Sequence, residues 1–372
     1  LDKVEKDLEK NKKLLDELKE LNDKIKNEEL LEKLDQFKQN SKNQTKNLEQ
    51  LVELTKKYYV EKKAEQLADK LDKLSEKQDK LSDNEKENTT DKQEEINKEF
   101  DKIQEDLNDL DKENKELKAP LDIPKDTEKE KSIDEDLKKA SEELQKENKA
   151  KAKPKQKSAS KKMKEMSMKM AQSMAEGEME ELQEDVKMLR QILDNLLVFS
   201  FSQEELMGQF RGLKRGSPSF NKNLKFQQDL KQQFKHVDDS LFAMSLRNPK
   251  IAEDVTKEIG NVHYNIDKSI ENLVEAQLSK GLSHQQYTIS ASNKLADFLS
   301  DILNSMQMSL SGMGQGKPKP GKGQGQGMQL PDIIQKQKGI GEKMKEGMKK
   351  GEKPGEGKKS GEGNKGKSGK EG

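Results

Sequence analysis

Apolar residues recur at steps of three and four along the first 150 residues, and polar residues fill the positions between them. Narrow seams of this kind are typical of coiled coils rather than of helices packed on several sides. The clearest seams are Leu14, Leu18, Leu21 and Ile25; Ala64, Leu67, Leu71, Leu74, Gln78 and Leu81; and Ile96, Phe100, Ile103, Leu107, Leu110, Asn114 and Leu117. The pattern predicts an all-α fold that begins with coiled-coil helices over 1–148.

Polar turns or prolines interrupt these seams near 40–44, 82–90 and 119–124. A proline removes a backbone donor and disfavours helix just before it, so the third break ends a helix. Several helices with polar turns favour antiparallel hairpins, although the pattern also allows an extended coil. Gln78 and Asn114 fall on seam positions, where a polar side chain either fixes the register or is tolerated near a helix end.

Wider apolar stripes begin at residue 163 and predict an antiparallel helical bundle over 163–310. The run at 189–201 is far shorter than the roughly 20 apolar residues of a membrane span, so we place it at the centre of this bundle. Ser202 and Glu205 form a capping box that predicts a new helix directly after the run. The predicted core residues are Leu189, Ile192, Leu196, Phe199, Phe234, Leu241, Ile259, Ile266, Ile270, Leu295, Phe298 and Ile302.

Two segments lack this apolar pattern. The stretch at 149–162 is basic and contains a proline, which predicts a solvated linker or an exposed helix start. The stretch at 311–372 is rich in glycine and lysine, which predicts a flexible, disordered tail. Within the bundle predicted for 163–310, Gly281 is expected to end the helix that precedes Gly281 in the chain.

Methionines at helical spacing in 163–179 either pack as an adaptable core or form a recognition face. A second, shorter amphipathic segment lies in the tail. The candidate interaction residues are Met163, Met166, Met170, Met174, Ile333, Ile334, Ile340 and Met344.

Composition narrows the function classes. The chain carries 72 basic and 72 acidic residues, whereas a dedicated nucleic-acid binder shows a basic excess. Hydrophobic residues make up 29%, too few for a single large compact core. There is no cysteine, which excludes disulfides. The chain begins at Leu1 without a signal peptide, so we expect it to be a piece of a longer protein.

Candidate chemistry is sparse. The histidines, His236, His263 and His284, are scattered and form no recognisable catalytic or metal-binding motif. The glycine-rich dipeptides at 316–317 and 321–322 lack the Ser or Thr, and the upstream strand, that a phosphate-binding loop requires. We therefore expect no catalytic residue, no cofactor and no metal site, and a chain that is not an enzyme.

Five blocks, in order, resemble one known family. They are "LRQILDNLLVFSFSQEELM", "DDSLFAMSLRNPKI", "VTKEIGNVHYNIDKSIENL", "QQYTISASNKLADFLSDILNSMQ" and a Gly/Lys/Met-rich tail near "KMKEGMKKG". Over about 163–350 the chain is similar to the Bacteroidetes form of the bacterial "domain of unknown function 4175" family, and 1–150 matches by composition only. The resemblance implies a protein anchored in the inner membrane by N-terminal helices outside this chain, with this region in the periplasm of the cell envelope. The family has no established activity.

Two functions follow as expectations. The first is a non-enzymatic scaffold or interaction region of a membrane-anchored envelope protein. The alternative is a chaperone-like module that binds envelope or secreted clients through the Met-rich helix 163–179. The expected partners are proteins, including a second copy of the chain through the coiled coils, and the membrane through the missing N-terminal part. No nucleic acid is expected.

Overall fold

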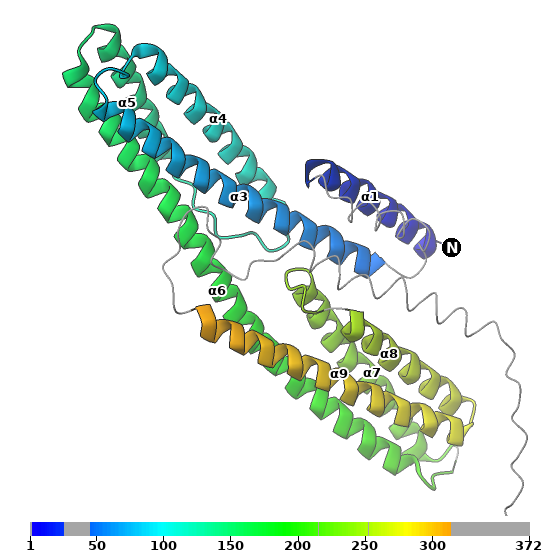
Figure 1. The fold of residues 1–372 in the computed structure, drawn as a ribbon. Helices are drawn as coiled ribbons and strands as arrows, with labels where there is room; N and C mark the ends of the chain where they lie inside the picture. The colour runs from blue at the N-terminus through cyan, green and yellow to red at the C-terminus, as the bar shows by residue number, and fades with distance from the viewer. Residues whose placement is uncertain (1, 26–44, 215, 252, 314–372) are drawn as a thin grey trace, which may run out of the picture.

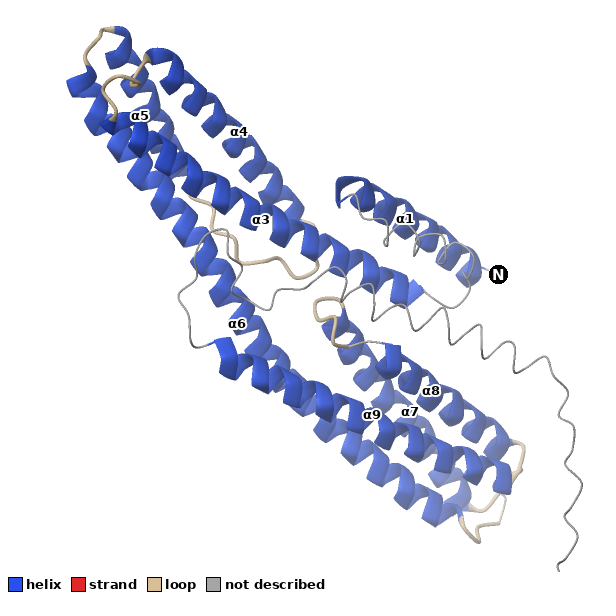
Figure 2. Cartoon of the chain, viewed as in Figure 1, coloured by secondary structure: helices blue, strands red, loops and turns tan. Residues whose placement is uncertain are grey.

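The computed structural model describes residues 2–25, 45–214, 216–251 and 253–313. Within these ranges the chain forms eight helices and no strand, which confirms the all-α prediction (Figure 2). The break predicted near 40–44 lies outside the described residues, as does the predicted tail beyond Met313.

The N-terminal helices form a first bundle rather than an extended coil (Figure 1). Its members are α3 (Thr45–Asp83), α4 (Thr90–Lys115), α5 (Thr127–Gln145) and the first half of α6 (Lys149–Phe210), with α1 (Asp2–Ile25) packed along α3. α3 and α4 are antiparallel, because Lys77 pairs with Glu99 near the turn and Lys63 with Glu113 at the far end. The breaks predicted near 82–90 and 119–124 separate these helices.

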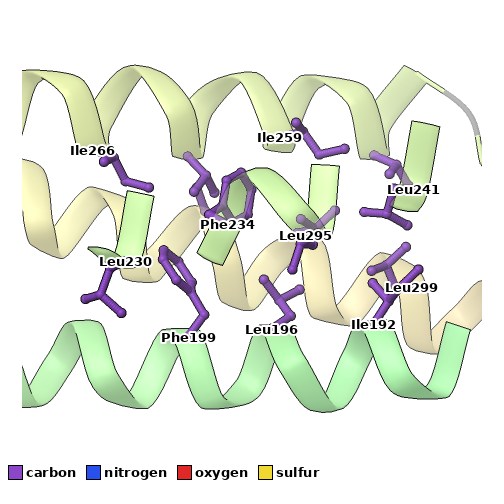
Figure 3. Close-up of a cluster of buried hydrophobic side chains, with 14 of the residues drawn as sticks. Ile192, Leu196, Phe199, Leu230, Phe234, Leu241, Ile259, Ile266, Leu295 and Leu299 are labelled. Carbon is purple, nitrogen blue, oxygen red and sulfur yellow. The ribbon is translucent and has the colours of Figure 1, made fainter. Parts of the chain in front are cut away.

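The second bundle contains the later part of α6 with α7 (Pro218–Ser245), α8 (Glu253–Val274) and α9 (Leu278–Met313). Most of the predicted core residues meet at its centre (Figure 3). The buried ones are Leu189, Ile192, Leu196, Phe199, Phe234, Leu241, Ile259, Ile266 and Leu295, while Ile270, Phe298 and Ile302 are partly buried against them. Phe199 and Phe234 pack with ring centroids 5.2 Å apart, a favourable aromatic separation.

α6 is one continuous helix of 62 residues that runs through both bundles (Figure 1). Of the two alternatives predicted for 149–162, the solvated linker is wrong and the helix start is correct, because the segment begins α6 and is capped by the Asn148 side chain. The segment is packed rather than exposed at Ala152 and Ala159. The continuity of α6 also corrects the predicted helix start at Ser202, which lies inside α6. The bundle predicted for 163–310 is divided differently, because Met163 belongs to the core of the first bundle and the core of the second begins near Val186.

Small residues explain why the basic segment is helical and packed. Ala152 and Ala159 are fully buried against neighbouring helices, and the Ser160 hydroxyl donates to the Ser75 carbonyl oxygen at 2.9 Å. The lysines point outward, where Lys157 pairs with Asp83 of α3. Pro154 removes one backbone donor near the helix start, and the packing compensates for that loss.

Buried amides form polar layers inside both bundles. Gln78 and Gln93 exchange hydrogen bonds of 3.0 and 2.7 Å in the first bundle, so Gln78 is an internal register contact rather than a tolerated exposed residue. Asn114 plays a different part, because its side chain bonds the backbone N–H and carbonyl of Leu121 and holds the loop after α4.

The corner between α8 and α9 differs from the prediction for Gly281. α8 ends at Val274 and the turn uses Ala276, which has a positive φ of 64°. Gly281 lies inside α9, where a Cβ would come within 2.7 Å of the Leu273 side chain. Glycine is therefore required here for close helix packing and not for termination.

Candidate functional site at the junction of the two bundles

The methionine stripe is not an exposed recognition face. Met163 and Met170 are fully buried and Met166 is 3% exposed, all in the core of the first bundle, with Met174 partly buried beside them. Ile333, Ile334, Ile340 and Met344 lie outside the described residues. The chaperone-like alternative therefore has no exposed methionine stripe to support it.

A cluster of polar and charged residues instead connects the two bundles, and we call it the junction. It draws on α3, on the middle of α6 and on the turn between α7 and α8. Its members are Gln50, Lys57, Glu61, Glu178, Glu181, Asp185, Arg247 and Asn248.

Asp185 of α6 is the buried centre of the junction, with 2% of its surface exposed. Arg247 donates to Asp185 Oδ1 from Nε at 2.9 Å and from Nη2 at 2.6 Å. Asn248 Nδ2 donates to Oδ2 at 2.9 Å. Because both carboxylate oxygens are bonded, the turn between α7 and α8 is held firmly against α6.

α3 reaches this turn from the first bundle. Lys57 Nζ donates to both carboxylate oxygens of Glu181, at 2.7 and 2.8 Å, and lies 3.4 Å from the Arg247 carbonyl oxygen. About two turns earlier in α3, the buried Gln50 Nε2 donates to the Ile251 carbonyl oxygen at 3.0 Å. The two bundles are thus joined twice, covalently through α6 and by polar contacts from α3.

A third contact lies towards the start of α3. Lys46 Nζ donates to both oxygens of Asp238 at 2.9 Å, and Asp238 Oδ2 lies 3.0 Å from His263 Nε2. Burial alone would raise the pKa of Asp238, but the hydrogen bonds from His263 and Lys46 outweigh burial and lower it. His263 also packs edge-on against Phe234, with centroids 4.9 Å apart.

The carboxyl of Glu61 is the most perturbed group at the junction. Burial raises its pKa to about 7, and the carboxylates of Glu178, Glu181 and Glu65 add to the effect while Lys57 opposes it. Burial also raises the pKa of Glu178. A negative charge here is therefore costly, and Glu61 changes charge near neutral pH.

The wider surface shows little that resembles a small-molecule site. A cavity of about 90 Å³ lies between α1, α3 and the end of α4, next to Lys24, Tyr59 and Glu113. Ligand pockets usually measure about 300–1,000 Å³. Across 2–25, 45–214, 216–251 and 253–313, no three His, Asp or Glu side chains are grouped so that they could hold a metal ion.

Sequence reasoning missed the junction because its residues resemble the charged positions of solvated helix faces. One signal was present. The chain uses lysine almost throughout, and its arginines are Arg190, Arg211, Arg215 and Arg247. A rigid guanidinium fork suits bidentate contact with a carboxylate, so an isolated arginine next to a helix break marked a structural contact.

No protein-family model, curated protein or solved structure matches this chain. Among the helices that the structure describes, none combines enough length with enough apolar character to cross a membrane.

Proposed function

We propose that this chain is an elongated, non-enzymatic scaffold that holds partner proteins at a set separation. The observation that carries the proposal is the single helix α6, which contributes to the cores of both bundles. At 1.5 Å per residue its 62 residues extend about 90 Å. A helix packed on both halves of its length resists bending, so the two ends of the molecule keep their distance.

The junction supports the same role. Without further contacts, the part of α6 between the two bundles would be a single helix surrounded by solvent, and it would bend easily. Lys57 of α3 contacts Glu181 in this segment, and Arg247 of the second bundle contacts Asp185 in it. Gln50 of α3 contacts the second bundle directly, at the Ile251 carbonyl oxygen. These contacts make the connection between the bundles stiffer than one helix could.

The proposal includes a location, which rests on the resemblance to the "domain of unknown function 4175" family. In this proposal, the chain lies on the periplasmic side of the inner membrane and is anchored by a preceding segment of the full protein. The helices hold envelope or secreted partner proteins at a distance from the bilayer.

A break in α6 tests the scaffold. We would insert a flexible Gly-Ser segment between Met179 and Glu180 in the full-length protein, then cross-link cells and recover the bound proteins. The wild type should recover its partners in fixed ratios and cross-linked to one another. The insertion should leave each partner bound, because the cores of both bundles remain complete. The cross-links between partners of different bundles should be lost, because a flexible segment no longer holds the bundles at a set separation.

The matched control carries the same insertion between Lys86 and Glu87, in the exposed turn after α3, and should behave as the wild type. Many clients, each recovered at low stoichiometry and unaffected by the α6 insertion, would contradict the scaffold and favour a chaperone-like role.

A further inference from the structure

The middle of α6 lies between the two hydrophobic cores. Met170 is buried in the core of the first bundle, Asp185 is buried at the junction, and no side chain across 171–184 is fully buried. This segment also contains Gly177, and glycine is among the weakest helix formers. The segment is therefore the part of α6 that bends most readily, and the junction contacts are what hold it.

The charge of this segment is unbalanced. It contains no lysine or arginine, and its acidic residues are Glu176, Glu178, Glu180, Glu181 and Glu184. Carboxylates three or four residues apart on a helix repel one another. The neighbouring cations come from other elements, with Lys57 of α3 on Glu181 and Arg247 of the turn between α7 and α8 on Asp185. The straight form of the segment therefore depends on what packs against it.

The packing of α3 on α6 brings one more carboxyl group, that of Glu61, to this acidic segment. The charged groups that interact with Glu61 are Lys57, Lys62 and Glu65 on α3, and Glu178 and Glu181 on α6. The turn between α7 and α8 contributes Arg247 to the same region, and the loop after α4 contributes Asp122. The last turns of α9, at 305–313, contain no charged residue. A proton on Glu61 thus removes one negative charge from a cluster that has too many.

We propose that the junction is a proton-controlled hinge in the middle of α6. With a proton on Glu61, α3 lies closed against the segment and the two bundles keep the arrangement of Figure 1. Without that proton, the carboxylates of Glu61, Glu178 and Glu181 repel one another, α3 separates from α6 and the segment bends. The hinge goes beyond the scaffold role, because it is a property of the chain without any partner.

The pKa of Glu61 gives the hinge its direction. Burial against α6 raises this pKa from 4.5 to about 7, and separation of α3 from α6 would return it towards 4.5. The closed junction binds the proton more tightly, so its advantage is complete below about pH 4.5 and is lost as the pH rises through about 7. Within that window, each pH unit changes the ratio of closed to bent molecules by up to about tenfold.

A pair of spin labels, one on each bundle, measures the hinge in the full chain. The chain has no cysteine of its own, so Lys98→Cys on α4 and Gln232→Cys on α7 provide two exposed labelling sites. Double electron–electron resonance should give one narrow distance distribution at about pH 5 and a broader one with a second population at about pH 8. Circular dichroism should be the same at both pH values, because the helices stay folded while the segment bends.

Three variants of the labelled chain identify the group that controls the hinge. Glu61→Gln carries no charge and should keep the narrow distribution at both pH values. The exposed control Glu95→Gln on α4 should keep the pH response, and so should His263→Gln, which removes the imidazole that contacts Asp238. A wild-type distribution that is the same at both pH values, or a Glu61→Gln chain that still broadens, would overturn the proposal. Broadening with a loss of helical signal would also overturn it, because the change would then be unfolding and not bending.

Discussion

Neighbouring residues in the run at 189–201 have opposite environments. Leu196 and Phe199 are 0% and 1% exposed, whereas Leu197 and Val198 are 44% and 62% exposed. The difference follows from helix geometry, because one residue step rotates the side chain by about 100°. The run is apolar on two faces of one helix, and only one of these faces belongs to the core of the second bundle.

Leu196→Ala should therefore lower the free energy of unfolding by roughly 2–5 kcal/mol, through lost burial and the cavity that remains. The control Val274→Ala removes a similar side chain from an exposed position at the end of α8 and should change stability by about 0.5 kcal/mol or less. Urea unfolding followed by circular dichroism measures both. Equal effects of the two substitutions would show that the assignment of faces is wrong.

At the scale of helices, buried amides set how α6, α7 and α9 align. Gln227 Oε1 accepts hydrogen bonds from Gln203 at 2.9 Å and from Gln285 at 2.6 Å, and Gln227 Nε2 donates back to Gln203 at 2.8 Å. All three side chains are fully buried. A shift of one helix along another would separate these groups inside an apolar core, so the layer favours one register.

Gln227→Leu should destabilise the second bundle by about 1–3 kcal/mol for each amide left without a partner. The triple variant with Leu at 203, 227 and 285 removes every polar group of the layer and should recover most of that stability. Thermal unfolding compares the two variants. A triple variant less stable than Gln227→Leu would contradict this prediction. It would show that the three amides stabilise the bundle by more than satisfying one another's hydrogen bonds.

At the scale of the whole molecule, the two bundles meet at a junction with too many carboxylates for its cations. Glu61 of α3 lies near Glu178 and Glu181 of α6, and Lys57 is the nearby base that lowers its pKa. The pKa of Glu61 in the folded chain is about 7, above its usual value of 4.5. The folded chain therefore binds the Glu61 proton more tightly than the unfolded chain does.

This difference sets the sign of a pH effect. The stabilisation from protonated Glu61 is complete below about pH 4.5 and is lost as the pH rises through about 7. Glu61→Gln carries no charge at any pH, so its free energy of unfolding should exceed that of the wild type at about pH 8 and approach it at about pH 4.5. The exposed control Glu95→Gln on α4 should track the wild type throughout. If the difference in free energy of unfolding between Glu61→Gln and the wild type were the same at every pH, the raised pKa assigned to Glu61 would be wrong.

The sequence by itself determined the helices and which residues are apolar on each. Steps of three and four place one face of each helix in a core, and the predicted core from Leu189 to Ile302 is buried or partly buried. Polar breaks near 82–90 and 119–124 end helices because prolines and short polar side chains compete with helical hydrogen bonds. These are local effects, and local effects are visible in a sequence.

The tertiary structure decided where helices continue and what their faces contact. Pro154 and Ser202 are local stop or start signals, yet α6 runs through both because burial of its face in two bundles outweighs them. Gly281 carries a termination signal but serves close packing against Leu273. The pairing of Asp185 with Arg247 joins residues 62 positions apart. Such contacts depend on how helices meet in space, and no spacing along the chain specifies that.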